Sequence, residues 1–202
     1  MPLGVYETET AKWLQEAIDE GVVFFDIGAN FGYFTLLGGR LVGRGRCIAF
    51  EPIPDNGEVI RQHLANNELT NISLEQTALS DRTGLAEFVL EDNSATSHLA
   101  EYEITHGASS RKSAIKVNTM RLDDYCSRNK IFPNVIKLDV EGAEVLVLKG
   151  AQAVLTSARP SLIISTHSES LKNEVIGLLE GYRYTVTQLP NFEHELSCIP
   201  MS

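Results

Sequence analysis

The sequence predicts an α/β protein built on a mostly parallel sheet. Short apolar runs alternate with amphipathic stretches along most of the 202 residues, and this alternation is typical of βαβ units. The last two apolar runs are separated by about seven residues, a connection short enough for an antiparallel pair. The chain has no internal repeat, and its length predicts one domain over residues 1–202.

The first third of the chain is expected to alternate helices with strands. Apolar residues at helical spacing predict a short helix over residues 8–20, and Gly21 is suited to end it. The run 22–27, interrupted only by Asp26, predicts a strand that is buried on both faces. A helix is then expected over residues 31–42 and a second strand over 47–50. A helix capped by Asp55 follows over 55–64, and a third strand over 72–79.

A flap is expected to interrupt the alternation between residues 85 and 120. Residues 85–90 and 114–117 predict the two strands of a hairpin, and small polar residues fill the segment between them. The alternation then resumes, with a strand over 135–140, a helix opened by Glu141 and Gly142, a strand over 161–167, a helix ended by Gly181, and strands over 184–188 and 196–199.

The composition excludes several classes of function. The formal net charge is −10, which disfavours nonspecific binding to nucleic-acid phosphates. No apolar run approaches the length of a membrane span, and no signal peptide precedes the first helix. The three widely spaced cysteines have no metal-binding pattern, so we expect a reduced, cytoplasmic protein. Nothing in the sequence specifies an oligomeric state.

A turn with two glycines follows the first predicted strand and points to a ligand. Asp26, Gly28, Asn30 and Gly32 form the pattern Asp-x-Gly-x-Asn-x-Gly, at a strand-to-helix turn where open α/β sheets bind ligands. About 25 residues later, Glu51 ends the second strand, where a carboxylate can accept hydrogen bonds from both hydroxyls of a ribose. In the alternative interpretation, Asp26 and Glu51 only cap strand ends and the glycines only shape the turn. The glycine turn and Glu51 together favour a nucleoside-binding site instead.

Two cofactors compete for this turn. A dinucleotide site requires G-x-G-x-x-G, and here Asn30 replaces the middle glycine. Asp26 would repel a pyrophosphate, but it would attract the ammonium and sulfonium groups of S-adenosylmethionine (SAM). We therefore predict a SAM-dependent enzyme; an NAD-dependent oxidoreductase and a nonenzymatic SAM-binding module are the alternatives. A P-loop is excluded because the turn contains no lysine.

Five segments of the chain resemble the FkbM-type family of SAM-dependent class I methyltransferases. The most specific is Lys-x-Asp-x-Glu-Gly-x-Glu, from Lys137 to Glu144. The resemblance implies a Rossmann-like, seven-stranded sheet of order 3-2-1-4-5-7-6 with helices on both faces. It also implies methyl transfer, usually to a hydroxyl oxygen of a small molecule, sugar or glycan. The matching segments are residues 25–35, 50–52, 78–81, 119–124 and 136–144, within about residues 22–168.

The same resemblance implies contacts for each part of SAM. The methionine part would contact the turn, through Asp26, Gly28, Asn30 and Gly32. The ribose would contact Glu51, with Pro52 beside it, and the adenine would contact Leu79, Ser80 and Asp81. Residues 92–116 and the loops after the fourth and fifth strands would form the wall of the acceptor site.

Methyl transfer to a hydroxyl requires a group that removes the proton and aligns the oxygen. Alternation along a strand places Lys137, Asp139 and Glu141 on one side, either for catalysis or for a structural salt bridge. His167 is expected beside Asp139, as a general base or as a cap of the next helix. These acids, with Glu144, suit a divalent ion as well, although we predict no metal.

Overall fold

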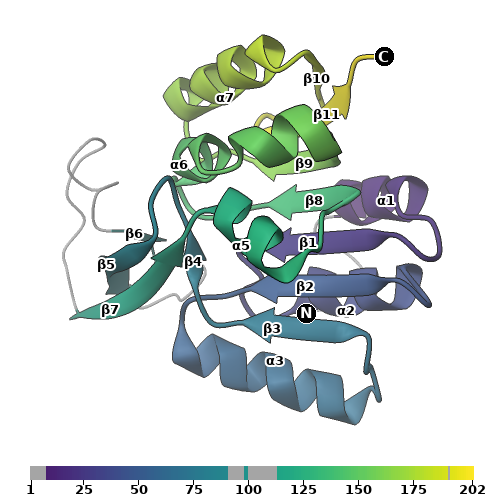
Figure 1. The fold of residues 1–202 in the computed structure, drawn as a ribbon, viewed down its shortest axis with the longest axis vertical. Helices are drawn as coiled ribbons and strands as arrows, with labels where there is room; N and C mark the ends of the chain where they lie inside the picture. The colour runs from purple at the N-terminus through teal and green to yellow at the C-terminus, as the bar shows by residue number, and fades with distance from the viewer. Residues whose placement is uncertain (1–7, 91–97, 100–112, 191) are drawn as a thin grey trace.

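The computed structural model describes residues 8–90, 98–99, 113–190 and 192–202 (Figure 1). Its centre is a seven-stranded sheet in the order β10-β11-β9-β8-β1-β2-β3. When these seven strands are numbered by their order in the chain, the sheet has the order 3-2-1-4-5-7-6, which confirms the prediction. Only β11 runs antiparallel to its neighbours. The strands are β1 (Val23–Ile27), β2 (Arg46–Phe50), β3 (Ile72–Glu75), β8 (Val135–Leu138), β9 (Ser161–Ser165), β10 (Tyr184–Gln188) and β11 (Glu195–Pro200).

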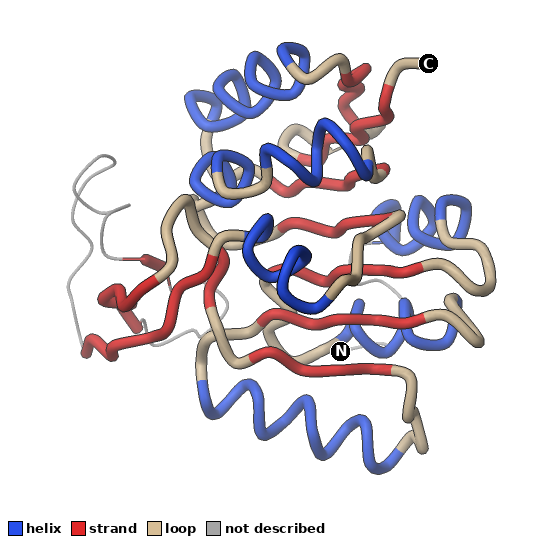
Figure 2. The backbone as a smooth tube through the Cα atoms, in the orientation of Figure 1, coloured by secondary structure: helices blue, strands red, loops and turns tan. Residues whose placement is uncertain are grey.

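Helices cover both faces of this sheet, as Figure 2 shows in blue. Successive residues of β1 point to opposite faces: Phe24 packs with Leu14 and Phe34 of one helical layer, while Phe25 packs with Tyr125 and Leu148 of the other. The first layer contains α1 (Thr8–Ala17), α2 (Tyr33–Leu41) and α3 (Pro54–Asn66), and the second α5 (Leu122–Asn129), α6 (Glu144–Lys149), a π-helical segment (Val154–Ala158) and α7 (Glu169–Gly181).

A second sheet lies beyond the carboxyl ends of the central strands (Figure 1). Its order is β4-β7-β5-β6, and its strands are β4 (Ala78–Leu79), β5 (Gly84–Leu90), β6 (His98–Leu99) and β7 (Ser113–Met120). The antiparallel pairing of β5 with β7 confirms the predicted hairpin, which is longer than expected. Most of the expected acceptor wall, residues 91–97 and 100–112, lies outside the described residues.

The expectation of one continuous strand over 72–79 is wrong. The main chain turns after β3, where the Thr77 amide donates to the Glu75 carbonyl at 2.9 Å. The Thr77 hydroxyl then donates to the Asn118 carbonyl at 3.0 Å, and Ala78 pairs with Thr119 of β7. The chain therefore leaves the main sheet at this point and enters the second one.

Several helix ends also differ from the predictions. Ile53, not Asp55, is the N-cap of α3, because Pro54 takes the first helical position. The helix expected to open at Glu141 begins at Glu144, since Glu141 and Gly142 both have positive φ, at 52° and 101°. Helix α1 ends at Ala17 rather than at residue 20, and α5 was not predicted. In the described part of the chain, no helix is long and apolar enough to cross a membrane.

Candidate active site

The turn between β1 and α2 is a left-handed backbone path. Gly28, Asn30 and Gly32 have φ values of 80°, 51° and 86°, a region that glycine and asparagine tolerate best. A Cβ atom on Gly28 would lie 1.7 Å from the carbonyl oxygen of Asp139. The Gly28 amide donates to the Phe50 carbonyl at 3.0 Å. The turn is therefore packed tightly against the segments that follow β8 and β2.

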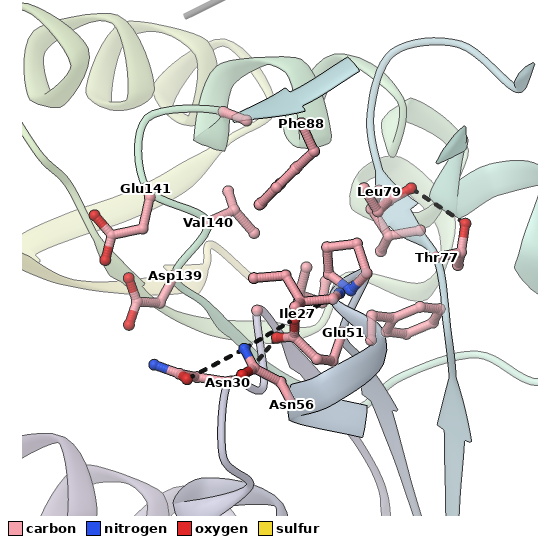
Figure 3. A pocket seen from close by; sticks show the side chains of 16 residues that line it. Ile27, Asn30, Glu51, Asn56, Thr77, Leu79, Phe88, Asp139, Val140 and Glu141 are labelled. Atoms are coloured by element: carbon pink, nitrogen blue, oxygen red, sulfur yellow. Dashed lines mark hydrogen bonds between the residues drawn. The ribbon is translucent and has the colours of Figure 1, made fainter. Parts of the chain in front are cut away.

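Glu51 follows β2 and is held by donors from three sides. Its Oε2 accepts the backbone N–H of Asn30 at 2.8 Å, and its Oε1 accepts that of Ile53 at 2.9 Å. Asn56 donates to Oε1 from α3 at 3.3 Å (Figure 3). Only 4% of Glu51 is exposed, and burial raises the pKa of its carboxyl to about 7 although these hydrogen bonds oppose the rise. Both oxygens thus have fixed positions.

A cavity opens at the carboxyl ends of β1, β2 and β8, and its empty space, including the solvent at its mouth, is about 600 Å³. This sheet edge is where open α/β sheets bind ligands. Figure 3 shows Asp139 and Glu141 on one side of the cavity and Thr77 and Leu79 on the other. The lining residues are Ile27, Gly28, Asn30, Phe50, Glu51, Pro52, Ile53, Asn56, Thr77, Ala78, Leu79, Phe88, Asp139, Val140, Glu141 and Ala143.

Seven of the residues that the sequence indicated line this cavity, and they are Gly28, Asn30, Glu51, Pro52, Leu79, Asp139 and Glu141. The apolar wall was missed: Phe88 comes from β5, whose position over the cavity no local pattern reveals. Asn56 was also missed: it lies in the first turn of α3, five positions after Glu51, and its burial is visible only in the structure. Val140 and Ala143 lie within the recognised Lys137–Glu144 segment.

Asp26 lies behind the cavity rather than in its wall. It is fully buried and its Oδ2 accepts the Thr35 hydroxyl at 2.6 Å. Burial raises its pKa, and the nearby ammonium of Lys137, 3.7 Å from Oδ1, counteracts the rise. The Lys137 ammonium also lies 3.3 Å from Asp139 Oδ2 and donates to the Gly28 carbonyl at 3.5 Å. One buried cation therefore connects the turn after β1 with the acid after β8.

Besides Asp26 and Lys137, four predicted residues lie outside the cavity wall, and they are Gly32, Ser80, Asp81 and His167. Gly32 is the N-cap of α2, where a Cβ atom would meet Ile60 at 3.0 Å. Ser80 is buried beyond Leu79, and its hydroxyl donates to Asp81 at 3.3 Å. Ser80 and Asp81 both follow β4, which pairs with β7 of the second sheet. Because the predicted third strand is divided between the two sheets, these two residues lie away from the cavity wall.

His167 joins the acids that follow β8 into one cluster. Its Nε2 lies 3.2 Å from Glu141 Oε2 and 3.4 Å from Asp139 Oδ1, and its Nδ1 lies 3.0 Å from Glu144 Oε1. Burial lowers the pKa of His167, but the hydrogen bonds and charges of Glu141 and Glu144 outweigh this and raise it to about 11. The predicted neighbourhood of His167 and Asp139 is confirmed. The expectation that strand alternation aligns Lys137, Asp139 and Glu141 is wrong, since β8 ends at Leu138 and Glu141 has a positive φ.

The sheet order and the position of the cavity define a Rossmann-like α/β fold with a ligand site at the carboxyl ends of its strands. Solved structures share this fold. An FkbM methyltransferase from Methylobacillus flagellatus superposes with a TM-score of 0.59 at 17% identity, covering 95% of this chain and 51% of that one. Fibrillarin from Aeropyrum pernix with bound SAM gives 0.58 at 14% identity, covering 95% of this chain and 74% of that one. This chain spans about half the length of the first protein.

A family model for the methyltransferase FkbM domain matches residues 26–186, so the chain belongs to this family. The 2-O-methyltransferase NoeI of Sinorhizobium fredii is 29% identical over 189 residues, 85% of this chain and 72% of that protein. The hexuronic acid methyltransferase AglP of Haloferax volcanii is 28% identical over 174 residues, 86% of this chain and 67% of that protein.

Proposed function

We propose that this chain transfers the methyl group of SAM to a hydroxyl oxygen of a sugar, a glycan or another small molecule. The observation that carries the proposal is the composition of the cavity. A fixed carboxylate, Glu51, lies on its floor, and two further carboxylates, Asp139 and Glu141, lie at one end. The named relatives NoeI, a 2-O-methyltransferase, and AglP, a hexuronic acid methyltransferase, support a sugar as the acceptor.

The cavity wall suggests how SAM lies. The backbone N–H of Asn30 occupies one position on Glu51 Oε2, and the other lone pair of this oxygen is available to a ribose hydroxyl. Oε1 already accepts from the Ile53 N–H and from Asn56, so a second hydroxyl would take the place of the longer Asn56 hydrogen bond. The apolar side chains of Ile53, Leu79 and Phe88 would sandwich the adenine. The methionine part would then pass over Gly28, where the absence of a side chain permits close approach.

In this pose, Asp26 acts through the turn instead of binding SAM directly. Its hydrogen bond to Thr35 and its proximity to Lys137 hold the first turn of α2 and the Gly28 carbonyl in place. Ser80 and Asp81 would support the Leu79 side of the adenine site from outside the cavity. We therefore assign Asp26, Ser80 and Asp81 a positioning role: they hold the residues that contact SAM.

The acceptor site is assigned to the end of the cavity beside Asp139 and Glu141. Both nitrogens of His167 face carboxylate oxygens, so His167 is better placed to orient the acids than to accept a proton itself. Asp139 is the proposed base: it removes the hydroxyl proton as the oxygen attacks the methyl carbon and the carbon–sulfur bond breaks. The products are a methyl ether, S-adenosylhomocysteine and the proton left on Asp139.

Calorimetry with S-adenosylhomocysteine tests the first part of this proposal. The folded chain should bind it, and Glu51→Gln should weaken binding at least tenfold, because an amide group must face one of the two backbone N–H donors. Glu58→Gln, which removes an exposed acid on α3, is the matched control and should leave the affinity unchanged. A folded protein that binds neither SAM nor S-adenosylhomocysteine would refute the proposal.

Transfer of labelled methyl from SAM to a panel of sugars and uronic acids tests the second part. Asp139→Asn should abolish transfer while S-adenosylhomocysteine still binds, because the carboxylate acts on the acceptor. Binding of SAM without transfer to any hydroxyl compound would instead favour a nonenzymatic SAM-binding module.

A further inference from the structure

We propose that Asp139, Glu141 and His167 bind one divalent metal ion at the acceptor end of the cavity. One ligand atom from each residue lies within 4.8 Å of the others. The His167 Nε2 lies 3.4 Å from Asp139 Oδ1 and 3.2 Å from Glu141 Oε2. Neighbouring ligands of an octahedral ion with bonds of about 2.1 Å stand about 3 Å apart. The two separations from His167 Nε2 therefore already match those of neighbouring ligands on such an ion, and the two carboxylate oxygens lie within 4.8 Å of each other.

Glu144 supplies an independent observation. It is fully buried and its Oε1 faces the other ring nitrogen of His167 at 3.0 Å. A carboxylate in that position is the usual partner of a metal-binding histidine, because it fixes the tautomer that presents Nε2 to the metal. Within the part of the chain that the structure describes, the second oxygen of Glu144 is buried without a hydrogen-bond partner. An orphaned buried acceptor beside the cluster is a place where water on a bound ion would donate a hydrogen bond.

The charge of the cluster also favours a cation. Asp26, Asp139, Glu141 and Glu144 bring four carboxylates together around two cations, the Lys137 ammonium and the protonated His167 imidazole. The carboxylates outnumber the cations, and carboxylates at these separations repel each other unless positive charge compensates them. A divalent ion between the three ligands would replace the His167 proton and add one positive charge.

The donor set indicates which ions fit. Mg²⁺ and Ca²⁺ prefer oxygen ligands only, whereas one imidazole with two carboxylates suits a first-row transition ion such as Mn²⁺. Asp139 and Glu141 line the cavity, so open positions of the ion would face the acceptor. When bound, the ion would act as a Lewis acid toward an acceptor with two adjacent oxygens, such as a vicinal diol or a 2-hydroxy acid. This role rests on the proposed function; the binding itself does not.

Mn²⁺ binding tests the inference directly. The chelator-treated protein would be titrated with Mn²⁺, with free Mn²⁺ measured by its electron paramagnetic resonance signal. We expect one ion per chain. Asp139→Asn and His167→Gln should each weaken binding at least tenfold, and Glu144→Gln should weaken it about tenfold through the imidazole. Glu58→Gln, an exposed acid on α3, should leave the affinity within about twofold of the unmodified protein.

Calorimetry with S-adenosylhomocysteine on the same samples separates the two proposals. If the protein binds this ligand but no Mn²⁺ at about 1 mM, the weak end of natural divalent sites, the metal inference is overturned and the proposed function stands. Equal Mn²⁺ affinity in Glu58→Gln and Asp139→Asn would also overturn it. Because Asp139 and Glu141 are partly exposed, their variants are expected to fold, and Mn²⁺ should raise the unfolding temperature of the unmodified protein but not of Asp139→Asn.

Discussion

Replacement of Gly28 by alanine tests whether the turn after β1 and the segment after β8 form one unit. The new Cβ atom would lie 1.7 Å from the Asp139 carbonyl oxygen and 3.2 Å from a methyl carbon of Val140. To relieve this contact, either the Asp139 carbonyl or the turn at Gly28 must move, and each is packed against the other. The φ of 80° adds a second cost, because a side chain destabilises the left-handed region by about 1–2 kcal/mol.

The expected loss of stability follows from these two terms. Overpacking a well-filled site costs about 1–3 kcal/mol, so the sum with the backbone term is about 3 kcal/mol. For a chain of this size, that corresponds to a fall of about 6–12 °C in the unfolding temperature. The affinity for S-adenosylhomocysteine should fall about 100-fold, because the ligand would meet a turn displaced by about 1 Å.

Gly177→Ala is the control for this experiment. Gly177 lies within α7, and a Cβ atom there would meet nothing within 4 Å. Alanine in a helix interior is favoured over glycine by about 0.5–1 kcal/mol, so this variant should be as stable as the unmodified protein or more so. Gly28→Ala with an unfolding temperature and a ligand affinity equal to those of Gly177→Ala would refute the reasoning.

Three further predictions follow from buried charges. The fold raises the pKa of Glu51 from its ordinary value of 4.5 to about 7, so protonated Glu51 stabilises the fold fully below about pH 4.5, and this contribution is lost as the pH rises through 7. In urea unfolding, Glu51→Gln should therefore reduce the slope of unfolding free energy against pH over this range. Equal slopes for the variant and the unmodified protein would contradict the prediction. Thr35→Val should cost about 1–3 kcal/mol by removing the donor to Asp26, with Thr35→Ser close to normal; equal urea midpoints would disprove this. Lys137→Met should cost about 3–5 kcal/mol, measured the same way, since Asp26 and Asp139 lose their shared cation; an unchanged midpoint would show that the cation is dispensable.

Periodicity and turn chemistry were sufficient to locate the central strands. Five or six apolar residues flanked by glycine or acid, as in the run around Phe24 and Phe25, have few alternatives to a buried strand. The break in the third strand was not readable in the same way. The apolar pattern continues through Ala78 and Leu79, and only the pairing of Ala78 with Thr119, 41 positions away, directs the chain into another sheet.

In the candidate site too, residues set by local sequence could be predicted, whereas residues placed by distant contacts could not. Gly28 and Glu51 were identifiable because a backbone turn and a strand end are local features. Phe88 was not, because its place in the cavity depends on how a hairpin folds back over a different sheet. The path after β8 was also unreadable. A strand pattern continues to Glu141, whereas the backbone becomes left-handed there and brings its carboxylate to His167.

The division of the strands into two sheets has a consequence for how the cavity can diversify. Ile27, Phe50 and Asp139 come from strands and loops of the seven-stranded sheet, whereas Leu79 and Phe88 come from a sheet that pairs only with itself in the described residues. A change in the length of the connection between β5 and β7 therefore leaves the register of every central strand unaltered. Doubling such a connection costs only about 0.6 kcal/mol of loop-closure entropy. The wall that the second sheet contributes to the cavity can therefore change shape while the central sheet keeps its architecture.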